Sequence, residues 1–153
     1  MEILIVILGA AALYGAALVI IPMISPMPQN LGVNNGQLKP CPKSPNCVST
    51  QARPDDRTHY MEPIPFEETP MDAQARLLNI INAMPRTQII TEKPNYLHVE
   101  FRTAVMRFID DVEFYIDDDT RMIHFRSASR LGQGDGGTNR RRMQAISGRF
   151  RQA

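Results

Sequence analysis

The chain has 153 residues, 43% hydrophobic and 22% charged, a length that suits one domain. It carries 17 Lys and Arg against 16 Asp and Glu, so the formal net charge is only +1. This balance excludes a general nucleic-acid binder, which would show a strong basic excess. Two Cys are too few for a Cys-only zinc site or for a disulfide-dense scaffold.

The N-terminal residues 3–24 carry no charge and are mostly Ile, Leu, Val, Ala and Gly. As a helix these 22 residues would extend about 33 Å, enough to cross a hydrocarbon core of about 30 Å. A cleaved signal peptide is the alternative, but the segment has no basic start and its apolar run is longer than usual. We expect a retained transmembrane anchor at 1–24, a linker at 25–38 and a soluble domain at 39–153.

Cys41 and Cys47 flank a segment in which Pro42 and Pro45 favour a turn. A short disulfide loop there would need an oxidising compartment such as the periplasm. Two unpaired thiols are the alternative, and a metal site is disfavoured because His59 is the only His nearby in the sequence. We therefore expect a protein of the inner membrane whose domain lies on the periplasmic or another extracytoplasmic side.

Next in the chain, residues 41–70 contain six Pro and predict an extended loop. A helix is predicted at 71–84, opened by Thr69-Pro70 and ended by Pro85. Four strands are predicted at 87–92, 95–102, 111–117 and 121–127. In the second of them, one face carries Leu97, Val99 and Phe101 and the other carries Tyr96, His98 and Glu100.

A turn at 118–120 joins the last two predicted strands. If Ile116 pairs with Arg121, then Val112 faces Phe125 and Phe114 faces Ile123 on the core side. After a Gly-rich loop at 132–137, Thr138 is a plausible N-cap for a helix at 139–150. The order helix, strands, helix predicts an α+β two-layer sandwich with a mainly antiparallel sheet and two packing helices.

Three ordered stretches resemble one known family. They are CPKSPNCVSTQA at 41–52 together with His59, YLHVEFRT followed by FIDDVEFYID, and RSASRLGQGDGGTNRRRMQAI at 126–146. Their order and spacing resemble the domain-of-unknown-function family 1499 (DUF1499) from about Lys39 to the C-terminus. The resemblance implies an association with bacterial envelopes or photosynthetic organelles and no established reaction.

The charge is distributed unevenly, since residues 121–153 hold eight Arg and one acid while 39–120 hold nine Lys and Arg against fourteen acids. One interpretation is internal pairing of the acids at 110–119 with the C-terminal arginines. The other is an anion site, in which the glycine loop and the following helix start supply N–H donors and arginines clamp a carboxylate or phosphate. The residues predicted to converge there as ligand-binding residues are Arg126, Ser127, Ser129, Arg130, Asp135, Asn139 and Arg140, with Asp135 holding one Arg in place.

Two functions are compatible with these features. The first is a membrane-anchored binding or assembly module, whose arginine- and glycine-rich surface docks a small anionic ligand or a protein partner. The second is an enzyme that acts on a small anionic substrate through His124, Asp111 and Arg126. The module is favoured because the sequence shows no nucleophile elbow and no metal-binding His spacing. No metal, cofactor or nucleic-acid partner is predicted, and no catalytic residue is assigned.

Overall fold

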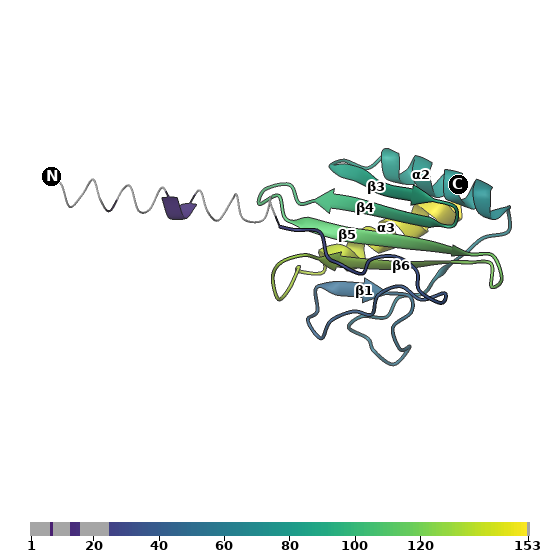
Figure 1. Ribbon diagram of the computed structural model, residues 1–153, viewed down its shortest axis with the longest axis horizontal. Helices are drawn as coiled ribbons and strands as arrows, with labels where there is room; N and C mark the ends of the chain where they lie inside the picture. Colours follow the sequence, from purple (N-terminus) through teal and green to yellow (C-terminus); the bar gives the residue numbers. More distant parts are fainter. Residues whose placement is uncertain (1–6, 8–12, 16–24, 153) are drawn as a thin grey trace.

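The computed structural model describes residues 7, 13–15 and 25–152. In this part of the chain six strands form one sheet in the order β1-β6-β5-β4-β3, β2 also pairs with β6, and every strand pair is antiparallel (Figure 1). The elements are β1 (Cys47–Ser49), β2 (Ile64–Pro65), α2 (Pro70–Asn82), β3 (Thr87–Lys93), β4 (Tyr96–Arg102), β5 (Ile109–Asp117), β6 (Met122–Ser129) and α3 (Thr138–Gln152). The predicted α+β class with a mainly antiparallel sheet is confirmed.

The core lies between one face of the sheet and the two helices. Helix α2 begins where the sequence predicts, because Thr69 Oγ1 accepts a hydrogen bond from the Asp72 N–H and Pro70 occupies the first turn. Its helical period buries Leu77 and Ile81, and α3 buries Met143, Ile146 and Phe150. These side chains pack with the apolar face of the central strands, which carries Leu97, Val99, Phe101, Val112, Phe114, Ile116, Ile123 and Phe125.

The register of the β5–β6 hairpin differs from the predicted one by two residues. Ile116 pairs with Ile123, not with Arg121, and Phe114 pairs with Phe125. The reason is the turn: Arg121 has a φ of 57° and belongs to it, with its guanidinium donating to the Asp118 carboxylate. A slip of two keeps every side chain on its predicted face, so the core assignment is correct although the pairing is wrong.

The N-terminal region separates into two parts. Residues 3–24, the predicted anchor, lie outside the described residues except for 7 and 13–15, and no helix among the described residues is long and apolar enough to cross a bilayer. Residues 25–38, predicted as a linker, are described and pack on the domain, where Leu38 is buried. In Figure 1 this dark segment crosses the face of the sheet that lies opposite α3.

The predicted disulfide is confirmed, with the Cα atoms of Cys41 and Cys47 5.7 Å apart. It joins the loop to the first residue of β1, and Cys47 is completely buried. Because β1 pairs with β6, the disulfide ties the proline-rich loop to the edge of the sheet.

Candidate functional site

The sheet face that points away from the helices is charged and buried. Alternate residues of β4, β5 and β6 point to this face, as does Arg130 just after β6. Except for Arg102, these side chains are less than a tenth exposed. We call the seven side chains the ionic network: His98, Glu100, Arg102, Asp111, Glu113, Arg126 and Arg130.

Arg130 and Asp111 form the centre of the ionic network. Arg130 Nε lies 2.8 Å from Asp111 Oδ2 and Arg130 Nη2 lies 2.7 Å from Asp111 Oδ1, a bidentate pair. Nη2 also donates to Glu100, whose other oxygen accepts from Arg102 Nη2 at 2.9 Å. His98 Nε2 lies 2.8 Å from Asp111 Oδ1. One carboxylate therefore orients both a guanidinium and an imidazole.

Glu113 forms the second part of the network and is completely buried. Its Oε1 accepts hydrogen bonds from Tyr96 Oη at 2.9 Å and from the Gly32 N–H at 2.7 Å. Its Oε2 lies 3.5 Å from Arg126 Nη1. Glu113 Oε2 and Arg126 Nε have no hydrogen-bond partner among the described residues, so this pair is less fully satisfied than the Arg130 pair.

The ionisation of these groups follows from their partners. Burial by itself raises the pKa of Asp111, but hydrogen bonds from Arg130 and His98 outweigh it and hold the pKa below its usual value. Hydrogen bonding to Asp111 raises the pKa of Arg130, whereas burial lowers that of Arg126. Burial and the nearby Glu113 raise the pKa of Tyr96. Asp111 is therefore held as a carboxylate beside the Arg130 guanidinium, and Tyr96 remains a neutral hydrogen-bond donor.

Residues 25–33, which we call the strap, cover the ionic network. The strap is fixed at two points, because the Ser25 carbonyl accepts from Arg130 Nη1 at 3.0 Å and the Gly32 N–H donates to Glu113. Between the strap and the edge of the sheet lies a cleft of about 730 Å³. We call it the strap cleft, and its sheet side includes Thr91, Lys93, Tyr96 and His98. None of the described residues that line it is acidic.

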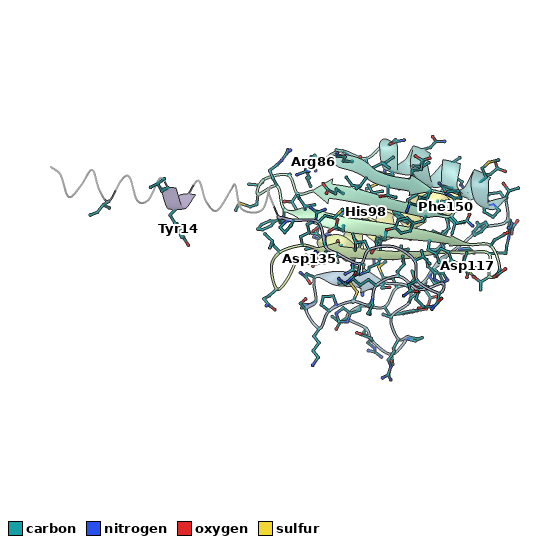
Figure 2. The ribbon with its side chains drawn as sticks, in the orientation of Figure 1. Tyr14, Arg86, His98, Asp117, Asp135 and Phe150 are labelled. Carbon is teal, nitrogen blue, oxygen red and sulfur yellow. A yellow bond between two sulfur atoms is a disulfide. The ribbon has the colours of Figure 1, made fainter. Side chains whose placement is uncertain are left out.

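Figure 2 shows His98 near the middle of the sheet, on β4, between β5 and the edge strand β3. Its Nε2 is directed to Asp111, and no hydrogen bond reaches its Nδ1 from the described residues. The strap cleft thus presents one buried imidazole, oriented by a carboxylate, and one exposed ammonium from Lys93. This arrangement can bind an anionic group, and the oriented imidazole can transfer a proton.

The residues predicted for an anion site do not converge on the glycine loop. Arg126 and Arg130 belong to the ionic network, on the face away from the helices. Arg140 donates instead to backbone carbonyls in the loop before β2, including Tyr60 at 3.1 Å. The geometry agrees with the interpretation of internal pairing, and anion binding by these residues stays a prediction.

The other predicted residues do meet, on the helix side of the sheet. Asn139 is completely buried, accepts from Ser127 Oγ at 2.5 Å and donates to Ser129 Oγ at 3.0 Å. Arg142, which the prediction did not include, donates to Asn139 and to Asp110. These contacts join α3 to β5 and β6, so they stabilise the packing of the helix on the sheet.

Asp135 was predicted to hold an arginine in place. In the structure it caps α3 instead. Its Oδ2 accepts from the Asn139 N–H at 2.7 Å and its Oδ1 from the Gly137 N–H at 2.9 Å. Burial raises the pKa of Asp135, but these backbone donors outweigh it and the net pKa is lowered. The helix N-terminus therefore already holds a carboxylate of its own, in the position predicted for a bound anion.

The cluster predicted for an enzyme is also rearranged. His124 Nδ1 lies 3.2 Å from Thr50 Oγ1 and its ring stacks on Tyr115, so it does not contact Asp111. The histidine that contacts Asp111 is His98, which lies on the predicted polar face of its strand but was not among the predicted site residues. The missed signal was the alternation shared by two neighbouring strands. The polar positions of 96–102 lie beside the acidic positions of 109–117 across one ladder.

A family model described as "Protein of unknown function (DUF1499)" matches residues 37–150. The match covers the disulfide, the ionic network, the glycine loop and most of α3. No curated protein matches the chain, and no solved structure does.

Proposed function

Since the chain belongs to the DUF1499 family, whose description assigns no activity, we propose its function from its own geometry. The proposed function is that of a membrane-anchored, extracytoplasmic binding module. It takes a small anionic ligand in the strap cleft. The observation that carries the proposal is the cleft itself, closed on one side by the strap and lined by His98 and Lys93 with no acid. Its volume of about 730 Å³ is in the range of small-molecule sites.

The anchor part rests on the apolar residues 3–24 and on the disulfide. The uncharged segment is long enough to span a bilayer as a helix. The disulfide between Cys41 and Cys47 suits an oxidising compartment, and this supports a domain outside the cytoplasm, on the inner membrane. Reporter fusions after Lys39 should show export. An intact mass that begins at Met1 supports a retained anchor, and a chain that begins near Pro26 refutes it.

The ligand part rests on charge balance. Three guanidiniums neutralise the three carboxylates of the ionic network, so the cleft above it has no excess negative charge to repel an anion. Lys93 adds a free cation at the rim. The strap contributes apolar surface from Met27, Leu31 and Val33. A ligand with a carboxylate at one end and an apolar body therefore fits both walls.

The test uses 4-phenylbutyrate, with its neutral amide as the matched probe, on the full chain in nanodiscs. The carboxylate should bind with micromolar to millimolar affinity and shift the NMR signals of the His98 ring, whereas the amide should bind more weakly. Lys93→Gln should weaken carboxylate binding about fivefold, the magnitude of an exposed ion pair, and Lys43→Gln should not. Equal binding of both probes, or binding unaffected by Lys93→Gln, would refute the proposal.

An enzyme is the second candidate, because His98 is oriented by Asp111 as a general base would be. The substrate would be a small anionic ester or a similar molecule held by Lys93. Ester hydrolysis that disappears in His98→Gln, in a variant that still folds, would favour the enzyme. Binding of carboxylates without turnover favours the module.

A further inference from the structure

One end of the domain is defined by Ser25, the first residue of the continuously described segment. Its carbonyl accepts from Arg130, and Arg130 N–H donates to the Ile109 carbonyl, so Ser25 lies beside the start of β5 and the end of β6. The loops 103–108 and 131–137 meet here around a shared pocket. Figure 2 places Arg86 and Asp135 at this end of the sheet, and Asp117 and Phe150 at the other. We call it the Ser25 end.

The Ser25 end carries exposed apolar side chains. Val105, at the tip of loop 103–108, is 84% exposed, and Leu131 after β6 is 36% exposed. Met27, two residues after Ser25, is 53% exposed. Single exposed apolar residues are ordinary on protein surfaces. These three come from separate segments that reach the same end of the sheet.

Exposed cations surround these apolar tips. Arg86 and Arg107 are exposed and form no ion pair with the described residues, and Arg141 is exposed at the start of α3. The acids at this end are already engaged, since Asp110 pairs with Arg142 and Asp135 caps α3. The surface therefore offers free positive charge beside apolar tips, the combination that attracts a protein to anionic lipid.

The strap limits the distance between the Ser25 end and the apolar residues 3–24. Ser25 follows directly on the apolar residues 3–24, and residues 25–38 pack on the sheet rather than acting as a spacer. A domain attached without a spacer must remain close to the plane from which its chain emerges.

We propose that the Ser25 end docks on the surface of an anionic phospholipid bilayer, with Val105 and Leu131 inserted among the headgroups and Arg86 and Arg107 on lipid phosphates. The inference rests on the proposed anchor at 3–24. It extends that proposal, because it assigns the domain one fixed orientation on the membrane. The opposite end, with the start of α2 and the β5–β6 turn, is left free for contact with other molecules.

The chain contains no Trp, so a single introduced Trp reports its own surroundings. We would compare Val105→Trp with Met71→Trp in full-length protein reconstituted into nanodiscs. Met71 is a matched control, because it is 78% exposed and lies at the opposite end of the sheet. Its position follows from Glu68, three residues earlier, whose carbonyl accepts a hydrogen bond from Arg121 in the β5–β6 turn. Lipids brominated near the headgroup quench a Trp that lies in the interface.

Val105→Trp should be quenched at least twofold more than Met71→Trp in phosphatidylglycerol discs, and the difference should decrease in phosphatidylcholine or after Arg107→Gln. Equal quenching of the two probes would overturn the inference, whether the end is free or covered by something else. Quenching that does not depend on lipid charge would overturn the role of the arginines. A chain that fails to co-purify with the discs would refute the anchor itself, and the two failures are therefore distinguishable.

Discussion

Replacing Arg130 with Met tests whether the arginines of the ionic network are structural. The Arg130 side chain is 5% exposed, and its guanidinium supplies the bidentate pair to Asp111 and one bond to Glu100. The change removes these donors, leaves the buried Asp111 carboxylate without a guanidinium partner and leaves Glu100 with Arg102 alone. Loss of one partner of a buried ion pair costs about 3–5 kcal/mol. For a chain of this size the melting temperature should therefore fall by about 6–20 °C.

The measurement is thermal and urea unfolding of the full chain in detergent, followed by circular dichroism. Arg53→Met is the matched control, because Arg53 pairs with Asp55 in an exposed position, where a pair contributes about 0–1 kcal/mol. Arg130→Lys keeps the charge but loses the bidentate geometry and should fall between the two. If Arg130→Met unfolds like Arg53→Met while ligand binding is lost, the structural assignment is wrong and Arg130 serves a ligand.

Three further predictions concern other groups. Asp135→Ala should lower the free energy of unfolding by about 1 kcal/mol because α3 loses its cap, whereas the exposed Asp119→Ala should change it by less than about 0.5 kcal/mol. Alkylation of the denatured, unreduced chain should label neither Cys41 nor Cys47, and removing their small loop should cost about 2 kcal/mol; labelling of both thiols would contradict the disulfide. The pKa of Asp111 is lowered on folding, so its contribution is complete above its ordinary value of 3.8 and is lost as the pH falls through the folded-state value. Asp111→Asn should therefore flatten the decrease of the urea midpoint below about pH 4, and an unchanged pH profile would argue against this ionisation.

The sequence by itself determined the class of fold and the inward face of each main element. The helical period of α2 gives the helix one apolar side. Strict alternation in β4 places Leu97, Val99 and Phe101 on the face that packs against the helices, and this assignment does not depend on which strands pair with β4. Thr69 with Pro70 marks the start of α2 by local chemistry alone. The spacing of Cys41 and Cys47 favoured the disulfide over two unpaired thiols, since a bridge across a short proline turn needs no distant contact, and the structure confirms it.

The tertiary structure alone decided which charges meet. A period of two fixes the face of a side chain but not its neighbour on the next strand, and the turn that holds Arg121 shifted the neighbours by two residues. As a result Arg126 faces Glu113. On the other side of β5, the ladder with β4 brings His98, and not His124, to Asp111. The strap shows the same limit, because residues 25–33 have no periodic pattern. The Ser25 carbonyl and the Gly32 N–H bond to charged side chains far along the chain, and these contacts place the strap over the sheet and form the cleft.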